Sequence, residues 1–480
     1  MSFDDIPTGV GPVYEGERIR GDQTHVEMGG PKQEMKFELV KVMPAEKIKD
    51  NDVKIVGPDI PDLKEGSNIP FGIVIEVSGS KLDPELEGVL ERRIHEFTNY
   101  IEGVMHLNQR YDIWERVSKA AVKKGFNTFK FIGTVLIRLY KAELPIVEKA
   151  QVTIYTDKEK MKPVFDDAMK IYKARDEKVR GMNDESVENF FGCVLCQSFA
   201  PTHCCIVTPE RTGLCGAINY FDARASARVD PKGPNFPIIK GKIINEKLGE
   251  FSGVNETLDK RSLGEVKRVA LYSAMEVPHT SCGCFEAIVF AIPEVGGMGI
   301  VDRNFKGSAI NGLPFSSMAN QTGGGKQVAG FHGVAVNYLM SKKFIRADGG
   351  WNVIVWLPSK VKERVKEAIP ADLIGKIATE TDATDLDGLT KFMKEKGHPL
   401  AAKLAAAEEI APAAAEVEAA GGEQAMVPAG GIPVGTIQMS MPGVGGGMGF
   451  KLIMKNCKIH AEKIIIKKME SAPAAAPKKK

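Results

Sequence analysis

Residues 190–226 read FFGCVLCQSFAPTHCCIVTPERTGLCGAINYFDARAS and hold five of the eight cysteines of the chain. No cysteine precedes this stretch, and the other three are Cys282, Cys284 and Cys457. Where thiols stay reduced, clustered cysteines are metal ligands or reactive groups before they are disulfides. We therefore expect a domain whose loops carry thiol chemistry on a packed scaffold.

Toward the N-terminus, the pattern indicates a mixture of strands and helices. Residues 36–80 alternate apolar runs with Pro, Gly and Asp, which is typical of short strands. Apolar residues at three-and-four spacing predict helices over 82–107 and 110–124, the second capped by Gly125. A strand-like segment at 150–156 and a charged helical stretch at 158–181 follow. The first domain, predicted over residues 1–160, is α/β or α+β.

Toward the C-terminus, short apolar strands separate Gly-rich loops. We predict these strands in VKRVALYSAM (266–275), EAIVFAIPEV (286–295) and WNVIVWLP (351–358), within a second domain of residues 161–398. An Ala/Glu/Pro/Gly tract at 399–435 is interpreted as a flexible linker. Residues 436–480 form a small basic segment that ends in a Pro/Ala/Lys tail. The predicted fold class is therefore mixed α/β, with two main domains.

Composition limits the function classes. A chain of 480 residues, 43% hydrophobic and 26% charged, is an ordinary globular protein of two or three domains. Its formal charge of +2 gives no field to recruit nucleic acid or an anionic membrane. No stretch has the length of a membrane-spanning helix, and the acidic, Gly/Pro-broken N-terminus does not have the pattern of a signal peptide. We expect a cytoplasmic protein.

The first cysteine group has the spacing Cys193-x2-Cys196-x8-Cys205-x9-Cys215. Four thiolates suit a [4Fe–4S] cube, and they also suit structural zinc. A two-residue gap lets one turn present two sulfurs to the same centre. Because neighbouring side chains rarely point to one metal, we interpret Cys204 as a spare thiol. Spacing alone leaves iron–sulfur and zinc open.

The second group is Cys282-Gly283-Cys284. Such a unit can offer one metal two thiolate sulfurs and the two backbone nitrogens between them, a donor set that favours a plane. Planar sets select Ni(II) or Cu(II) rather than zinc. Glycine suits the middle position because it has no Cβ to obstruct a metal-facing backbone. Alone this is a weak motif, but the first group strengthens it.

With both groups in hand, the chain resembles the acetyl-CoA synthase family, and within it the β subunits of archaeal acetyl-CoA decarbonylase/synthase complexes. The resemblance runs from about Phe37 to about Gly350. It is carried by HEFTNYIEGVMHLNQRYDIW, GTVLIRLYKAELPIVEKAQVTIYTD, FGCVLCQSFAPTHCCIVTPERTGLCGA, CGCFEAIVFAIPE and SKKFIRADGG.

The resemblance implies a Ni-Ni-[4Fe–4S] cluster, called the A-cluster. It assigns the cube to Cys193, Cys196, Cys205 and Cys215, with the sulfur of Cys196 also bridging to the proximal nickel. It assigns the distal nickel to Cys282 and Cys284 with the amide nitrogens of Gly283 and Cys284. The implied reaction joins carbon monoxide, coenzyme A and a methyl group from a corrinoid iron–sulfur protein. In methanogens it also runs toward acetyl-CoA cleavage. CO dehydrogenase subunits of the same complex are the other implied partners.

Three further residues are candidates by the same resemblance. Phe199 matches a phenylalanine that crowds the proximal nickel, and it could equally be a core aromatic. Trp114 and Arg116 match a pair associated with coenzyme A, where stacking on adenine and pairing with phosphate suit these residue types. His203 and His279 flank the two cysteine groups and are candidates for hydrogen bonds to the cluster.

Other readings remain open from the sequence. A non-catalytic [4Fe–4S] electron-transfer or structural protein would leave Cys282 and Cys284 incidental, and a structural zinc module is a third option. Residues 322–326, TGGGK, lack the hydroxyl residue that a phosphate loop requires, because position 327 is Gln. Cys457, among lysines, is interpreted as a free thiol.

Overall fold

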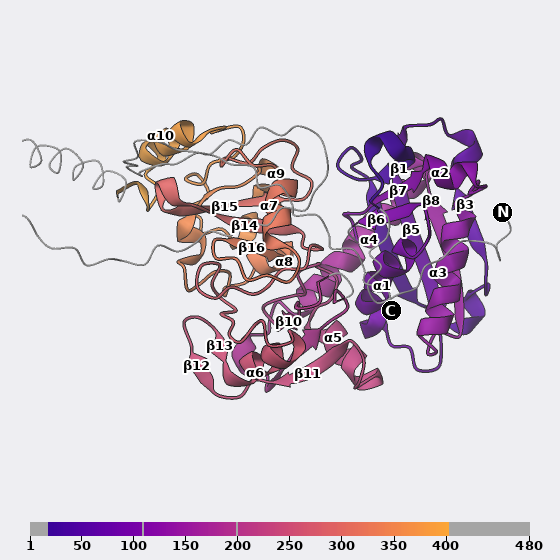
Figure 1. Cartoon of the computed structure of the whole chain (residues 1–480), viewed down its shortest axis with the longest axis horizontal. Coiled ribbons are helices and arrows are strands. Elements are labelled where there is room, and N and C mark those ends of the chain that lie inside the picture. The colour runs from indigo at the N-terminus through magenta and orange to yellow at the C-terminus, as the bar shows by residue number, and fades with distance from the viewer. Residues whose placement is uncertain (1–17, 108–109, 198–199, 403–480) are drawn as a thin grey trace, which may run out of the picture. The chain divides into compact units, whose positions relative to one another are not determined.

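The computed structural model describes residues 18–107, 110–197 and 200–402. All of them belong to one compact unit, whose limits are residues 1–418 (Figure 1). Helices and mixed sheets alternate along it, which confirms the mixed α/β class. The predictions for Phe199, Cys457 and most of the 399–435 linker lie outside the described residues, as does the whole 436–480 segment. The domain ranges stay a prediction.

Two four-stranded sheets form the N-terminal part. Their orders are β2-β5-β8-β3 and β4-β1-β7-β6. The first sheet consists of β2 (Lys36–Val42), β5 (Phe71–Ser78), β8 (Lys149–Tyr155) and β3 (Val53–Val56). The second consists of β4 (Ser67–Ile69), β1 (Thr24–Gly29), β7 (Trp114–Ser118) and β6 (Val104–Leu107). Strand β8 alternates buried and half-buried residues, as a strand with one face on a core does.

Three helices pack with these sheets, namely α1 (Glu87–Asn99), α3 (Lys130–Glu143) and α4 (Lys158–Lys178). Helix α1 follows a turn in which Asp83 accepts a hydrogen bond from the Glu85 backbone N–H at 2.8 Å. Its Leu90, Ile94 and Phe97 join the core of the N-terminal sheets. Arg92 and His95, on the same helix, are buried as well. Most residues of helix α1 are therefore buried, polar ones included.

The predicted helix over 110–124 is wrong in its first half. Residues 114–118 form strand β7, and only α2 (Lys119–Lys123) is helical. Likewise the end of the predicted 82–107 helix is strand β6, beyond a turn at Gly103 with φ +78°. β7 pairs with both β1 and β6, so tertiary hydrogen bonding overrode a helical apolar spacing.

The C-terminal part of the unit contains three further sheets. They are β10-β9-β11, the pair β12-β13, and β16-β14-β15-β17. The strands are β9 (Asn189–Cys193), β10 (Cys205–Val207), β11 (Asn235–Ile239), β12 (Ile243–Asn245), β13 (Glu250–Phe251), β14 (Ala287–Ile292), β15 (Gly297–Asp302), β16 (Phe331–Val334) and β17 (Ile354–Trp356). The helices are α5 (Tyr220–Val229), α6 (Ser252–Arg261), α7 (Phe315–Thr322), α8 (Val336–Leu339), α9 (Ser359–Arg364) and α10 (Leu386–Lys396).

Of the three strands predicted in this part, two are confirmed, as β14 and β17. The third, at 266–275, is wrong. This segment makes only an isolated bridge between Ala270 and Pro278, and its backbone bonds to loop carbonyls such as that of Leu248. Burial of its apolar residues in a loop produces the same sequence pattern as a strand. None of the helices in the described residues has the length and apolar character to cross a membrane.

Candidate metal centre

The first cysteine group is built on the β9–β10 pair. Cys193 ends β9, Cys205 begins β10, and the two are directly opposite in the antiparallel register. Directly opposed residues bring their side chains within about 5 Å when they share a face. The four expected cube ligands lie in one hydrophobic cluster, namely Cys193, Cys196, Cys205 and Cys215. All four are buried.

Contacts between the members tie this group together. The Leu214 backbone N–H donates to Cys205 Sγ at 3.4 Å, which holds the Cys215 loop against β10. Burial raises the pKa of Cys193 and of Cys205, and neighbouring thiolates raise both further. In water-free surroundings, a set of close thiolates needs a cation to compensate its charge.

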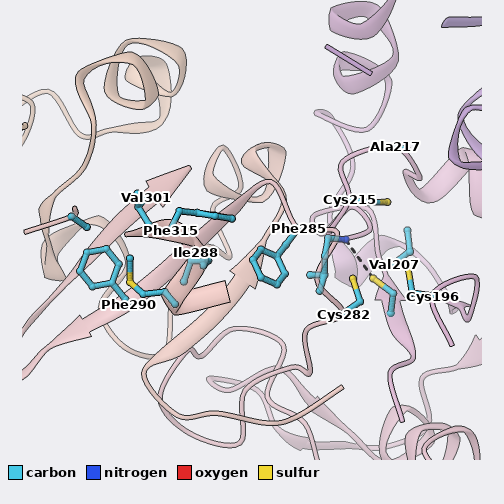
Figure 2. Packing of buried hydrophobic residues seen from close by; sticks show 14 of the residues in the cluster. Cys196, Val207, Cys215, Ala217, Cys282, Phe285, Ile288, Phe290, Val301 and Phe315 are labelled. Atoms are coloured by element: carbon cyan, nitrogen blue, oxygen red, sulfur yellow. Dashed lines mark hydrogen bonds between the residues drawn. The ribbon is translucent and has the colours of Figure 1, made fainter. Parts of the chain in front are cut away.

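The second group meets the first at Cys196. The sulfur atoms of Cys196, Cys282 and Cys284 all lie within 4.8 Å of one another. Hydrogen bonds from Cys282 and Cys284 hold the pKa of Cys196 well below its ordinary value. The Cys196 hydrogen bond and burial act in the opposite direction on Cys284, whose pKa rises to about 12. Figure 2 shows Cys196, Cys215 and Cys282 gathered beyond Phe285, with Ile288 and Phe290 on its other side.

The Cys282–Cys284 loop has a backbone that only glycine accommodates easily. Gly283 has φ +145°, in the range that side chains rarely adopt. The Cys284 backbone nitrogen lies 3.3 Å from Cys282 Sγ, so the N–H points to the space the sulfurs surround. The carbonyl of Cys282 accepts from Gly324 N–H at 2.8 Å, and that of Gly283 accepts from Arg303.

An arginine on helix α1 contacts two of the three sulfurs. Arg92 Nη2 lies 3.2 Å from Cys196 Sγ and 3.9 Å from Cys284 Sγ. The side chain is only 2% exposed. Burial opposes its charge, but the thiolates of Cys196, Cys284 and Cys215 hold the pKa of Arg92 above its ordinary value. The guanidinium is therefore a fixed positive charge beside the thiolates.

His95, one turn further along α1, lies 3.8 Å from Cys284 Sγ through Nε2. Its Nδ1 is 3.1 Å from His106 Nδ1, and His106 Nε2 hydrogen-bonds to Glu38. Burial lowers the pKa of His95 and lowers that of His106 to about 4. A buried chain of hydrogen bonds therefore leads from the sulfurs into the N-terminal sheets.

A cavity of about 1050 Å³ opens onto the Cys282–Cys284 loop. One wall is helix α1, with Arg92, His95 and Asn99. Apolar side chains line part of the cavity, namely Met105, Leu107, Leu195, Phe305 and Phe315. Basic side chains line it as well, namely Arg18, Arg20, Arg92, Arg116, Arg303 and Lys326. The cavity can take a long ligand that has both anionic and apolar portions.

Trp114 and Arg116 both line this cavity. They are two apart on β7, so they share a face, and the Arg116 guanidinium lies 4.4 Å from the Trp114 ring centroid. Arg116 also pairs with Glu27 at 2.6 Å and donates to the Ile19 carbonyl at 2.8 Å. A phosphate at Arg116 would therefore have to share the guanidinium with Glu27.

The other flanking residues have structural partners. His279 Nε2 accepts from the Ile206 N–H at 3.0 Å, and its Nδ1 donates to the Thr280 carbonyl at 2.6 Å. His203 Nδ1 bonds to Thr280 Oγ1 at 2.8 Å. Cys204 packs in a separate hydrophobic cluster with Phe190, apart from its neighbour Cys205.

Sequence reasoning missed Arg92, His95 and Arg303. The first two lie three apart on helix α1, which also buries the polar residues Glu91, Thr98 and Asn99, so their spacing does not single them out. Arg303 follows β15, and no pattern singles it out either.

The donor set fits a thiolate-bound metal cluster. The four cysteines of the first group are buried together, and three sulfurs converge where the second group joins. Thiolates select soft metals and iron–sulfur clusters, and a glycine backbone between two of them offers nitrogen donors. Arg92 supplies positive charge against an anionic site. Gly283, between the two sulfurs of the second group, presents no Cβ that would obstruct such a cluster.

Known proteins are similar to this chain over nearly its whole length. Residues 6–161 match the family described as the beta subunit of the CO dehydrogenase/acetyl-CoA synthase complex, and residues 172–406 match the family described as the C-terminal part of the ACS/CODH beta subunit. The chain is 54% identical over 469 residues to acetyl-CoA decarbonylase/synthase complex subunit beta 2 of Methanocaldococcus jannaschii, with 97% of each chain covered. It is 50% identical over 465 residues to the protein of the same name from Methanosarcina thermophila, covering 96% of this chain and 98% of the relative.

A solved structure of the C-terminal domain of an acetyl-Coenzyme A synthase alpha subunit is also similar. It is 39% identical, covers 25% of this chain and 96% of its own, and has a TM-score of 0.24. The near-complete matches to archaeal subunits are the stronger finding. The chain belongs to the family of beta subunits of the CO dehydrogenase/acetyl-CoA synthase complex, and it is an enzyme.

Proposed function

We propose that this chain synthesises and cleaves acetyl-CoA at a Ni-Ni-[4Fe–4S] cluster. The observation that carries the proposal is the meeting of Cys196 with Cys282 and Cys284, whose sulfurs lie within 4.8 Å of one another. A cysteine that serves both groups is what a cube linked to a second metal requires. The family to which the chain belongs supports the reaction, because its archaeal relatives are named acetyl-CoA decarbonylase/synthase subunits.

The residues proposed to hold the cluster are those that the family resemblance assigns. Cys193, Cys196, Cys205 and Cys215 would hold the cube. Cys282 and Cys284, with the backbone nitrogens of Gly283 and Cys284, would hold nickel. When bound, such a cluster supplies the metal chemistry that joins a methyl group with carbon monoxide. Phe199, which follows Cys196 by three positions in the sequence, stays a proposed crowding residue.

The remaining work falls to the protein. Arg92 compensates the charge of the thiolates from 3.2 Å, and Leu195 and Phe315 give the same cavity apolar surface. The cavity would take coenzyme A with its thiol toward Cys284. Its phosphates would then lie near Arg18 and Arg20, where charge-assisted hydrogen bonds are strong. Trp114 offers a ring on which adenine can stack.

The reaction also needs a methyl donor and a source of carbon monoxide. We propose a corrinoid iron–sulfur protein and CO dehydrogenase subunits as partners, since the relatives are named as subunits of a complex. The apolar side chains in the lining, such as Leu195 and Phe315, suit small uncharged groups. The thiol of coenzyme A must approach the same sulfurs, so one cavity would serve both steps.

The test is Cys284→Ser, with Cys204→Ser as the matched control. Wild-type protein loaded anaerobically with iron, sulfide and nickel should hold about two nickels per four irons. Cys284→Ser should keep its iron, lose nickel and lose acetyl exchange with acetyl-CoA. Cys204→Ser should match the wild type, because Cys204 lies in another cluster.

Two results would contradict the proposal. Wild-type protein that takes up iron and refuses nickel would be a plain [4Fe–4S] protein. Zinc without iron would make the first cysteine group a structural zinc module.

A further inference from the structure

Two fixed hydrogen-bond donors grip the carbonyl side of the Cys-Gly-Cys loop. Gly324 N–H donates to the Cys282 carbonyl at 2.8 Å, and Arg303 Nη2 donates to the Gly283 carbonyl. These are the carbonyls of two peptides whose nitrogens belong to Gly283 and Cys284. The two peptides that the proposed function uses as nitrogen donors are thus the ones whose carbonyl oxygens accept these hydrogen bonds.

Arg303 is committed to this loop. Its side-chain N–H groups bond to the carbonyls of Gly283 and Phe285, the latter at 3.0 Å from Nη2 and 3.3 Å from Nε. Its guanidinium lies beside two aromatic rings, 5.7 Å from the Phe285 centroid and 5.0 Å from that of Phe315. Across the described residues, no carboxylate forms an ion pair with it. Burial lowers the pKa of Arg303, and the negative charges of Asp112, Cys284, Cys282 and Glu286 act in the opposite direction.

The nitrogen side of the same peptide faces the sulfurs. A trans peptide directs its C=O and N–H to opposite sides. With the Gly283 oxygen on Arg303, the Cys284 nitrogen is directed to Cys282 Sγ, at 3.3 Å. Arg303 therefore fixes the peptide plane in the orientation that brings a backbone nitrogen beside the two thiolates.

We propose that Arg303 is a positioning residue for the nickel site, and that it stabilises binding of backbone nitrogen to the metal. The inference rests on the proposed function, since it concerns the metal of that same site. A peptide nitrogen that binds metal releases its proton to solvent, and amide resonance shares the resulting negative charge with the carbonyl oxygen. Arg303 and Gly324 donate at those two oxygens. A charge-assisted hydrogen bond there is about twice as strong as a neutral one.

The inference also gives residues 322–326 a role. Gly324 and Gly325 have φ +77° and +80°, and their consecutive N–H groups donate to the carbonyls of Cys282 and Ser281, each at 2.8 Å. This glycine-rich loop resembles a phosphate loop in composition, but here its backbone donors are directed at protein carbonyls.

The experiment compares Arg303→Met and Arg303→Lys with Arg346→Met. Arg346 is a matched control, because it too donates to a backbone carbonyl, that of Glu246 at 2.7 Å, and stacks on a ring. Full-length protein carrying its iron–sulfur cluster is titrated with nickel chloride alone. Bound nickel is counted after dialysis, and the visible absorption of planar Ni(II) is recorded.

Arg303→Met should bind nickel about 10- to 100-fold more weakly than wild type, the usual loss when a supporting residue is removed. Its iron content should be unchanged, and the planar Ni(II) band should weaken. Arg303→Lys should fall between, because lysine keeps the charge but lacks the fork that reaches two carbonyls. Arg346→Met should match wild type.

Nickel affinity and absorption equal to wild type in Arg303→Met would overturn the inference and leave the proposed function standing. Absence of nickel from wild type would instead overturn the proposed function. If Arg303→Met does not fold, Arg303→Lys decides. Wild-type affinity in that variant contradicts the positioning role, and weakened affinity supports it.

Discussion

Single residues around the thiolates carry charge that the interior would otherwise reject. Arg92 and Arg303 reach the site from different elements and contact different atoms, the first sulfur and the second carbonyl oxygen. Neither needs a change of protonation, since guanidinium stays charged in proteins. Burial raises the pKa of Cys193 and Cys205 and so favours their neutral thiols. The fixed positive charges act against this and favour an anionic metal centre.

Glu115 is the residue at which pH should act on stability. It is fully buried on β7, and among the described residues neither carboxylate oxygen has a hydrogen-bond partner. Burial raises the pKa of Glu115 to about 8 from 4.5. The folded protein therefore keeps a proton that the unfolded chain releases above pH 4.5. This contribution to stability is complete below that pH and falls by about 1.4 kcal/mol per unit until it is lost near pH 8.

Glu115→Gln should remove this pH dependence, because glutamine does not ionise. The variant should gain about 3 to 5 kcal/mol relative to wild type between pH 4.5 and pH 8. Denaturant unfolding at pH 5, 6.5 and 8 measures it. Glu265→Gln, an exposed site, should track wild type at every pH. Parallel curves for wild type and Glu115→Gln would contradict the assignment.

At the scale of elements, Gly333 of strand β16 lets the Cys282–Cys284 loop pack closely because it has no side chain. A Cβ on Gly333 would lie 2.4 Å from Phe285 Cδ1 and 2.8 Å from Ser281 Oγ. These residues flank the loop on both sides. The Gly333 N–H also donates to Ser281 Oγ at 3.0 Å.

Gly333→Ala should displace the loop while leaving the β9–β10 cysteines in place. We expect a stability loss of about 1 to 3 kcal/mol from overpacking and a lower nickel-to-iron ratio. Thermal unfolding and metal analysis check both. Gly375→Ala is the control, since its Cβ would meet open space. An unchanged metal ratio in Gly333→Ala would show that the loop tolerates the shift.

The helices and strands also differ in how well the sequence predicts them. The helix predicted over 82–107 is confirmed over 87–99, and the charged helical stretch predicted over 158–181 is confirmed as α4. Strands β6 and β7 were misread as helix because their hydrogen bonds go to β1 and to each other, which no local pattern records. The cysteine groups are visible as spacing. Their meeting at Cys196 requires the chain between Cys196 and Cys282 to fold, so sequence could assign it only through resemblance.

At the scale of the molecule, a bound cluster would act as a cross-link. It would join the β9–β10 pair to the Cys282–Cys284 loop, segments far apart along the chain that converge in one hydrophobic cluster. A group that binds only the folded state stabilises it, by about 2.7 kcal/mol at a concentration 100 times its Kd. The unfolding equilibrium should therefore depend on metal.

Removal of the metals should lower the unfolding temperature of the wild-type protein by several degrees. Scanning calorimetry of metal-loaded and metal-free protein under anaerobic conditions measures the difference. Cys196→Ser, which removes the shared sulfur, should abolish most of it, and Cys204→Ser should retain it. An equal unfolding temperature with and without metals would contradict a cross-linking role.

Helix α1 contacts both the N-terminal and the C-terminal parts of the unit. Leu90, Ile94 and Phe97 anchor it in the core of the N-terminal sheets, while Arg92 and His95 touch the sulfurs of the C-terminal part. The two regions that match separate family descriptions, 6–161 and 172–406, therefore both contribute residues to the metal centre. A fragment that begins after residue 161 would lack Arg92 and His95 beside its sulfurs and would lack the wall of the cavity that α1 forms.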